Sequence, residues 1–276
     1  MKLTLAFSPC PNDTFIFDAL VHHRYPHELH PEPALLDVET LNRMATKGEL
    51  PVSKLSFAAF AFVSENYQIL SSGAALGNNC GPLVIYNREP DLTQAGKLRV
   101  AIPGKFTTAN LLLSIFYPEL TQKTEMVFSD IEDAVLSGKA DLGLIIHENR
   151  FTYEQKGLKK LADLGEKWEQ RFGVPIPLGC IAVSRHLPEK EKMMIQEAIR
   201  KSVEWAFQHP QDSREYVMEH AREMSETVQQ QHISLYVNRF SVDLGDEGRR
   251  AVELLMKEGV KAGLLPIVKE PIFVEN

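Results

Sequence analysis

Short apolar runs alternate with stretches of helical spacing along most of the chain. Residues 3–7 are largely apolar and predict a buried strand. Polar side chains at residues 12–14 precede a run at 15–23 whose apolar residues recur at helical spacing. Further strands are expected at residues 35–38, 52–56, 67–71 and 82–86, with helices at 39–48 and 57–62.

A second series of strands and helices begins near residue 97. Strands are expected at residues 98–102, 126–128, 141–146, 158–164 and 177–183, with helices at 109–116 and 130–137. From residue 188 onward the pattern is mainly helical, with breaks near Pro210 and Ser225 and a helix around 247–262. This alternation of strands and helices predicts an α/β fold.

The length of 276 residues exceeds the usual size of one compact core, so two lobes are expected. In one arrangement a discontinuous lobe I, residues 1–95 plus 181–276, encloses a lobe II at residues 96–180. The crossings near residues 95 and 180 would act as hinges, and a ligand would bind between the lobes. The alternative is two sequential domains divided near Pro188.

Composition narrows the function classes. The net charge of −7 offers no basic footprint for nucleic acid or an anionic membrane. No apolar stretch approaches the roughly 20 residues that span a bilayer, and the apolar start at residues 3–7 is too short for a secretory signal. The three cysteines are widely spaced without a CxxC pair, which suits a reducing cytosol and argues against a disulfide framework. We therefore expect a cytoplasmic protein without nucleic-acid or membrane partners, and the sequence leaves its oligomeric state open.

The loop at residues 8–14 is the first candidate binding segment. Two prolines within three residues make it rigid, and Ser8 and Asn12 can donate hydrogen bonds beside the amides that open the next helix. A plain strand-to-helix turn with a capping residue explains the segment equally well. Asp13 is interpreted as a helix cap, and Cys10 as a buried thiol without a catalytic role.

The segment at residues 104–109 repeats this arrangement in the middle of the chain. Thr107 and Thr108 follow a glycine turn and, with free amides at a helix N-terminus, would form a pocket for a carboxylate that includes Ala109. The glycines match neither GxxxxGK[ST] nor GxGxxG, so nucleotide phosphates are not indicated. Helix capping remains an alternative explanation. Lys54 could clamp an acid, although by itself it is better interpreted as a surface lysine.

His147 is the strongest candidate for a catalytic residue. It follows an apolar strand, at the end where α/β proteins place their sites, and neutral imidazole can take up and return a proton. Glu148 would orient His147 or face solvent. The other eight histidines, including the group His22, His23, His27 and His30, are interpreted as surface or satisfied core residues. We predict neither a metal site nor a serine triad, since no G-x-S-x-G occurs.

Several of these segments, taken in order, resemble the 1,4-dihydroxy-6-naphthoate synthase family, which acts late in the futalosine route to menaquinone. The likeness lies in residues 8–15, 37–42 and 54–56, in Gly104 with residues 107–109, and in residues 143–148, 177–179 and 236–238. It implies a two-lobed fold of the periplasmic-binding-protein type II kind, and this favours the discontinuous division of the lobes.

The resemblance also implies an activity. The family is a carbon–carbon lyase that converts cyclic dehypoxanthinyl futalosine to 1,4-dihydroxy-6-naphthoate and releases a dihydroxyacetone fragment. The chemistry needs proton transfer but no redox cofactor. The family's base corresponds to His147, and its substrate contacts correspond to Lys54, Leu55 and Ser56 and to Thr108 and Ala109.

Three other functions stay open on the sequence. A protein that only binds a small carboxylated ligand would share the lobes and the two anion sites. Chorismate dehydratase, from the same pathway, shares the lobe architecture. The third function, the effector domain of a transcription factor, is a weaker alternative, because the chain shows no helix-turn-helix and no basic patch.

Overall fold

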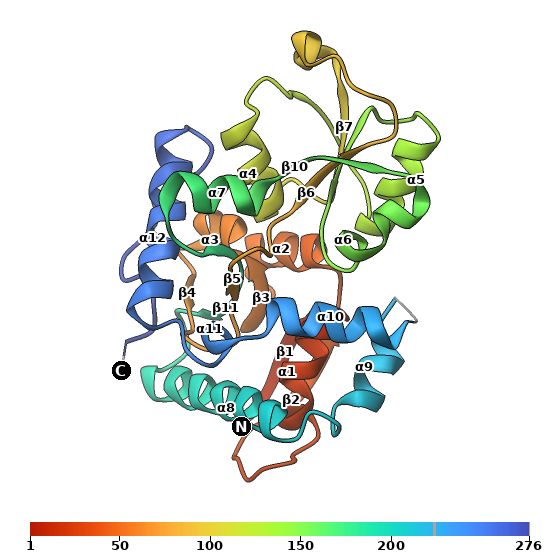
Figure 1. The fold of residues 1–276 in the computed structure, drawn as a ribbon. Coiled ribbons are helices and arrows are strands. Elements are labelled where there is room, and N and C mark those ends of the chain that lie inside the picture. The colour runs from red at the N-terminus through yellow and green to blue at the C-terminus, as the bar shows by residue number, and fades with distance from the viewer. Residues whose placement is uncertain (223–224, 276) are drawn as a thin grey trace.

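The computed structural model describes residues 1–222 and 225–275 and contains two sheets, which lie one above the other in Figure 1. The lower sheet has the strand order β2-β1-β3-β11-β4, and β5 pairs with β11. β1 is parallel to β2 and β3, whereas β11 is antiparallel to β3 and β4. The strands are β1 (Lys2–Phe7), β2 (His30–Leu35), β3 (Val52–Ser56), β4 (Tyr67–Ile69), β5 (Ala75–Gly77) and β11 (Ile176–Ser184).

The upper sheet has the order β10-β6-β9-β7-β8. β7 is parallel to β8 and β9, and β6 is antiparallel to both of its neighbours. The strands are β6 (Leu83–Tyr86), β7 (Arg99–Ile102), β8 (Gln122–Glu125), β9 (Leu142–Ile145) and β10 (Lys159–Asp163). The sequence therefore produces the α/β arrangement that its alternating pattern predicts.

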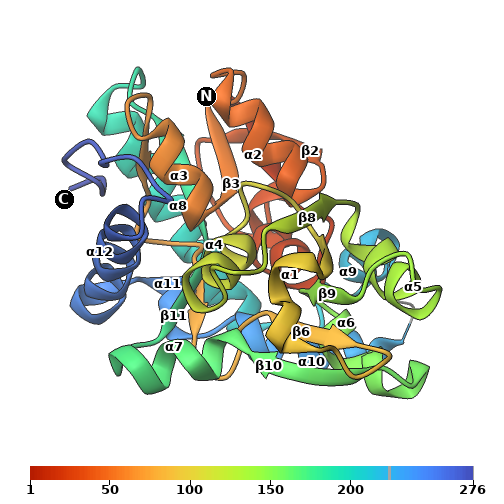
Figure 2. The ribbon, with the colours of Figure 1, turned by 90° about the horizontal axis from the view of Figure 1, so that it is seen from above.

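Helices cover both sheets. Those from the sequence segments of the lower sheet are α1 (Pro11–Val21), α2 (Val38–Thr46), α3 (Phe57–Val63), α8 (Glu189–Gln208), α9 (Arg214–His220), α10 (Glu226–Tyr236), α11 (Arg239–Val242) and α12 (Gly245–Lys261). Those from the segment of the upper sheet are α4 (Thr108–Phe116), α5 (Ile131–Leu136), α6 (Asn149–Thr152) and α7 (Leu164–Phe172). Short 3₁₀ turns lie at Leu92–Lys97, Phe128–Asp130 and Tyr153–Lys156. Viewed from above, α12 and α5 lie at opposite sides of the molecule (Figure 2).

The chain passes between the sheets earlier than the sequence indicated. The expected division was residues 1–95 plus 181–276 against 96–180, yet β6 at Leu83–Tyr86 pairs in the upper sheet and β11 begins in the lower sheet at Ile176. By strand pairing, the crossings lie at about residues 78–82 and 173–175. The physical reason is that all four residues of β6 are buried, so their apolar pattern fits the interior of either sheet.

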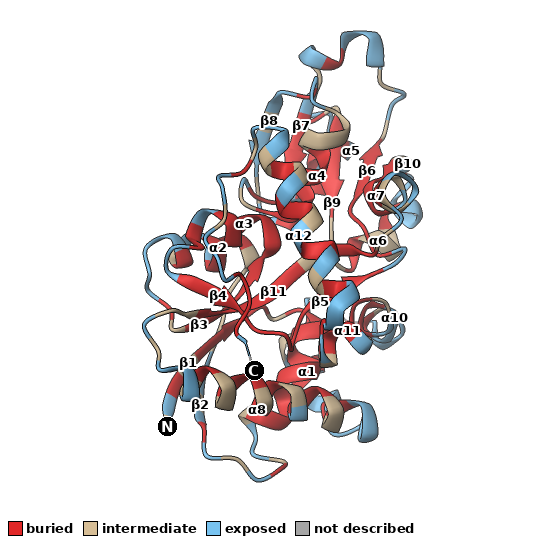
Figure 3. Cartoon of the chain, turned by 90° about the vertical axis from the view of Figure 1, so that its left-hand side faces the viewer, coloured by how far each residue is buried: buried red, intermediate tan, exposed pale blue. Residues whose placement is uncertain are grey.

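The strands in the interior of each sheet are more buried than the strands at its edges. Every residue of β3, β6 and β9 is buried, and Figure 3 shows the edge strands β2 and β8 with more exposed chain. The largest apolar cluster contains residues of both sheets, among them Leu55 of β3 and Leu144 of β9. The two lobes therefore pack against each other through a shared apolar cluster.

Within residues 1–222 and 225–275, no helix is both long enough and apolar enough to cross a membrane.

Candidate active site

A cavity between the two sheets contains about 660 Å³ of space free of protein atoms, part of it open to solvent. Every residue that the sequence placed in a catalytic or binding role lines it: Ser8, Asn12, Lys54, Leu55, Ser56, Thr107, Thr108, Ala109 and His147. The sequence assigned no such role to the remaining lining residues: Asp13, Val38, Ala75, Cys80, Pro82, Ile146, Leu178, Gly179 and Tyr236.

The loop between β1 and α1 forms one wall of the cavity. Asp13 does not cap the helix as the sequence suggested, because α1 already begins at Pro11 and Asp13 lies within its first turn. Its buried carboxylate instead accepts hydrogen bonds from the Ser8 amide (3.2 Å), the Ser8 hydroxyl (2.7 Å) and Nδ2 of Asn12 (2.8 Å). Asp13 therefore fixes the side chains that face the cavity.

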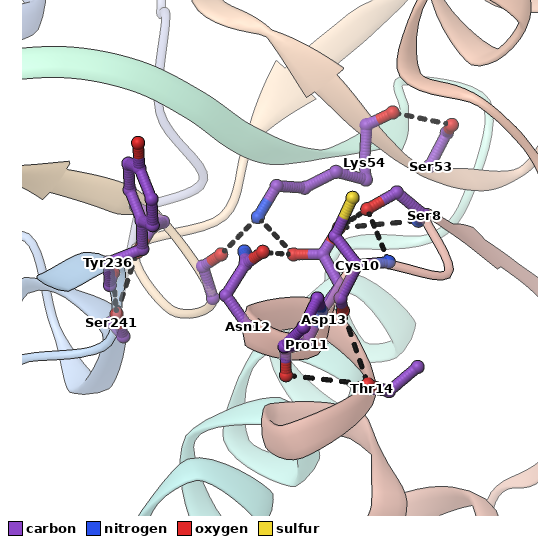
Figure 4. A network of polar contacts seen from close by, with 12 residues as sticks. Ser8, Cys10, Pro11, Asn12, Asp13, Thr14, Ser53, Lys54, Tyr236 and Ser241 are labelled. Carbon is purple, nitrogen blue, oxygen red and sulfur yellow. Dashed lines mark hydrogen bonds and ion pairs between the residues drawn. The ribbon is translucent and has the colours of Figure 1, made fainter. Parts of the chain in front are cut away.

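Lys54 is buried, with 5% of its surface exposed, so its interpretation as a surface lysine is wrong. β3 lies between β1 and β11 in the interior of the sheet, and all five of its residues are buried. The Lys54 ammonium donates to Oδ1 of Asp13 at 2.7 Å and to the carbonyl of Gly73 at 3.3 Å (Figure 4). An ammonium group has three donors, so one remains for a ligand.

The N-terminus of α4 presents backbone amides to the cavity. The Thr107 hydroxyl caps the helix by accepting from the Asn110 amide (3.2 Å) and donates to the carbonyl of Gly104 (2.9 Å). The amides of Thr108 and Ala109 have no hydrogen-bond partner among the described residues. Because a helix N-terminus favours negative charge, these two amides form an anion site.

Hydrogen bonds close the lobes over the cavity. Phe106, ahead of α4, donates its amide to Oε2 of Glu39 in α2 at 3.2 Å. Arg43 of α2 forms an ion pair with Glu125 of β8 at 2.6 Å. Both contacts join a helix of the lower lobe to the upper lobe, so the cavity is enclosed between them.

His147 follows β9 in a left-handed backbone conformation, with φ at 58°. Such a conformation is uncommon for a residue with a side chain and clusters at functional sites. Its ring packs edge-on against Phe128, with centroids 5.0 Å apart, and no described residue forms a hydrogen bond to it. Burial lowers the pKa of His147 below its ordinary 6.5, although the nearby Glu148 carboxylate opposes the shift. A neutral ring with a free nitrogen at the cavity can accept a proton.

His232 is the neighbour that the sequence analysis missed. This α10 residue is fully buried, and its ring lies nearly parallel to that of His147, with centroids 5.9 Å apart and planes 18° apart. Its Nε2 is 2.8 Å from Oδ1 of Asn12. The signal was present, because Gln229, His232, Ile233 and Tyr236 share one helical face at i, i+3, i+4 and i+7 spacing.

Cys10 is buried, as the sequence analysis expected, and burial raises the pKa of its thiol well above the ordinary 9.0. A thiolate nucleophile is therefore disfavoured. One ligand atom each from Cys10, His147 and Glu148 lie within 4.8 Å of one another, a set that could hold a metal ion. The absence of a metal site accordingly remains a prediction.

A cavity between two α/β lobes defines a protein of the two-lobed ligand-binding class. A structure from Candida albicans, described as having the generic periplasmic binding protein fold, is similar with a TM-score of 0.69. It is 16% identical, over 99% of this chain and 93% of that chain. The predicted fold class is confirmed.

The chain belongs to the family described as menaquinone biosynthesis, which it matches over residues 3–261. A protein of Thermus thermophilus named 1,4-dihydroxy-6-naphthoate synthase is 48% identical over 99% of both chains. A protein of Streptomyces coelicolor with the same name is 45% identical over 96% of this chain and 95% of its own. A crystal structure from Archaeoglobus fulgidus is 34% identical with a TM-score of 0.90, over 96% of this chain and 98% of that chain. The predicted family is thereby confirmed.

Proposed function

We propose that the chain is a lyase that converts cyclic dehypoxanthinyl futalosine to 1,4-dihydroxy-6-naphthoate and releases dihydroxyacetone, in menaquinone biosynthesis. The observation that carries this proposal is the near full-length identity, 48% and 45%, to two proteins named for that activity. The protein acts on a small molecule, and we place it in the cytoplasm.

The geometry supports His147 as the base. In a retro-aldol cleavage, the base takes the proton of a substrate hydroxyl, the hydroxyl oxygen becomes a carbonyl, and the neighbouring carbon–carbon bond breaks. The electron pair of that bond passes into the conjugated ring system, which becomes aromatic, and the proton is then returned. A positioned base that is neutral at pH 7 typically contributes 10²- to 10⁴-fold to such a rate.

Two groups at the cavity are suited to hold the substrate carboxylate. The free amides of Thr108 and Ala109 offer a fixed anion site at α4, and Lys54 has one donor left after it binds Asp13 and Gly73. Ser8 and Ser56 line the same cavity with hydroxyl groups. A bound acid would be held rigidly, and this orients the reacting carbon toward His147.

We further propose that the lobes open and close around the crossings at residues 78–82 and 173–175. Each lobe then consists of one sheet with its helices, and closure excludes water during the cleavage. The bonds of Glu39 to Phe106 and of Arg43 to Glu125 would form only on closure.

The test is incubation of the purified protein with cyclic dehypoxanthinyl futalosine, with mass detection of both products. Formation of the naphthoate and of dihydroxyacetone in equal amounts supports the proposal. Recovery of unchanged ligand that is tightly bound supports a binding protein instead. Dehydration of chorismate in a parallel incubation supports the related dehydratase, and either result would overturn the proposed reaction.

A further inference from the structure

The phenol of Tyr236, the last residue of α10, is a polar group at the cavity that the protein itself leaves unpaired. The residue is 8% exposed and lines the cavity. The Ser241 hydroxyl lies 3.5 Å from its backbone carbonyl, whereas the phenol points away from Ser241 and its hydroxyl group has no hydrogen-bond partner among the described residues (Figure 4). A buried hydroxyl group without a partner is unfavourable, so this one is suited to meet a polar atom of a ligand.

The hydroxyl group of Tyr236 is available as a donor. Burial raises the pKa of the phenol above its ordinary 10.0, so the group keeps its hydrogen at neutral pH. A neutral phenol has one hydrogen to donate, and no described residue accepts it.

Tyr236 lies on the side of the cavity where His147 stands. It follows His232 by four positions in α10, so the two side chains share one helical face. Their ring centroids are 4.7 Å apart, and the His232 ring in turn lies 5.9 Å from that of His147. The phenol is therefore close to the base.

The rest of the lining suits a flat aromatic ligand that carries an acid. Apolar side chains line the cavity, among them Leu55, Ile146 and Leu178. The free amides of Thr108 and Ala109 offer a site for the carboxylate. In 1,4-dihydroxy-6-naphthoate the carboxylate stands on one ring and both hydroxyl groups on the other. A second donor in the cavity can therefore meet an oxygen of the ring that lacks the carboxylate.

We propose that Tyr236 is a catalytic residue whose hydroxyl group donates a hydrogen bond to a ring oxygen of the bicyclic substrate. This inference rests on the proposed function. During the cleavage His147 takes the proton of the substrate hydroxyl, and the electron pair of the breaking carbon–carbon bond passes to a conjugated ring carbonyl. That carbonyl oxygen becomes a phenolate, which the protonated His147 finally neutralises, and Tyr236 keeps its own proton throughout.

The developing charge makes this hydrogen bond a contribution to rate more than to affinity. A donor binds a phenolate oxygen more strongly than the carbonyl oxygen from which it forms. The Tyr236 hydroxyl therefore stabilises the transition state more than the bound substrate, which lowers the barrier to cleavage.

The first test is the steady-state kinetics of Tyr236→Phe, which removes only the hydroxyl group. We expect kcat to fall about 10²- to 10³-fold, as for the loss of one donor to a developing oxyanion, with KM changed by no more than about threefold. The melting temperature should stay near that of the parent, because the hydroxyl group has no partner among the described residues.

Tyr216→Phe is the matched control. The Tyr216 hydroxyl group is also buried without a partner among the described residues, but Tyr216 does not line the cavity. Its kinetics should equal those of the parent. A kcat of Tyr236→Phe close to that of the parent would overturn the proposal, whether or not KM rises, because the hydroxyl group then does not act on the transition state.

A second measurement works without turnover. Binding of 1,4-dihydroxy-6-naphthoate and of 2-naphthoate, which has the same rings and carboxylate but no hydroxyl groups, is titrated anaerobically to the parent and both variants. The preference of the parent for the dihydroxy acid should fall roughly threefold to tenfold in Tyr236→Phe and stay unchanged in Tyr216→Phe. An equal preference in all three proteins would overturn the contact with the ring oxygen.

These outcomes separate the inference from the proposed reaction. The expected loss of preference in a protein that does not turn over the futalosine derivative would uphold the contact and reject the reaction. Turnover by the parent with an unaffected Tyr236→Phe would do the reverse, and a parent that binds neither acid would reject both. Where Tyr236→Phe fails to fold, a crystal structure of the parent with the dihydroxy acid decides. A separation above about 3.5 Å between the Tyr236 hydroxyl and every ring oxygen rejects the contact.

Discussion

Thr108 and Leu178 join the two lobes through a single hydroxyl group. The Thr108 hydroxyl, at the first residue of α4, donates to the carbonyl of Leu178 in β11 at 2.8 Å. The same oxygen accepts from the amide of Ala58 at the start of α3, at 3.2 Å. The hydroxyl thus stabilises the closed arrangement of the lobes. The backbone amides of Thr108 and Ala109 remain available to bind the substrate.

We expect Thr108→Val to raise KM roughly tenfold or more while kcat changes less. The valine leaves the Ala58 amide and the Leu178 carbonyl without a hydrogen-bond partner in the closed form. Each unpaired group destabilises that form by about 1–3 kcal/mol, and about 1.4 kcal/mol changes a binding constant tenfold. Steady-state kinetics measure the effect. Thr121→Val is the control, since the exposed Thr121 hydroxyl has no partner among the described residues. An unchanged KM would show that the bridge does not govern closure.

His147→Ala should lower kcat by about 10²- to 10⁴-fold and leave KM and the melting temperature close to those of the parent. The ring makes no hydrogen bond to the described protein, so its removal breaks no polar contact. Turnover of the futalosine derivative and a thermal melt are measured side by side, with His186→Gln as the control. Turnover near the parent rate would remove His147 from the mechanism.

The sequence predicted the interior of this fold better than its edges. The strand expected at residues 52–56 is β3 with the same bounds, and the helix at 57–62 is α3 with one residue more. The strands expected at 35–38 and 126–128 lie instead at His30–Leu35 and Gln122–Glu125. Both are edge strands with exposed polar residues, so they lack the apolar run that marks a buried strand.

Long-range pairing accounts for what the sequence did not reveal about the site. Lys54 was interpreted as a surface residue because its partner Asp13 lies 41 positions away, and no local pattern links the two. His232 is 220 positions from its partner Asn12, so the spacing within its helix can indicate that His232 is buried but not which residue it contacts. The cavity residues were nevertheless found, because turns at strand ends and helix N-termini are visible locally.

The pH dependence of stability should reflect His147, a partly buried histidine whose pKa is lowered in the folded protein. Burial lowers the pKa of His147 in the folded protein below the 6.5 of the unfolded chain. Above pH 6.5 neither form is protonated at this site and stability is unaffected. As the pH falls from 6.5 toward the folded-state pKa, the unfolded chain binds the proton first, so the free energy of unfolding decreases by up to about 1.4 kcal/mol per pH unit.

Urea unfolding of the parent and of His147→Gln between pH 5 and pH 8 measures this contribution. The variant should lose less stability on acidification than the parent, because it lacks the titrating ring. The kcat/KM profile of the parent should also keep its plateau to below pH 6.5. Identical losses of stability in the two proteins would mean that His147 titrates normally in the fold.

Lys54→Met should destabilise the protein by about 3–5 kcal/mol, because it leaves the buried carboxylate of Asp13 without its counter-charge. Asp13→Asn should cost a similar amount, since it leaves Lys54 unpaired. The double variant should lose less than the two single losses combined, because neither charge then remains uncompensated. Urea unfolding measures all three. Lys2→Met is the control, because Lys2 and Glu32 form an exposed pair at 3.7 Å that should contribute nothing measurable. Strictly additive losses would mean that Lys54 and Asp13 do not stabilise each other, and the third ammonium donor could then no longer be assumed to point at the substrate.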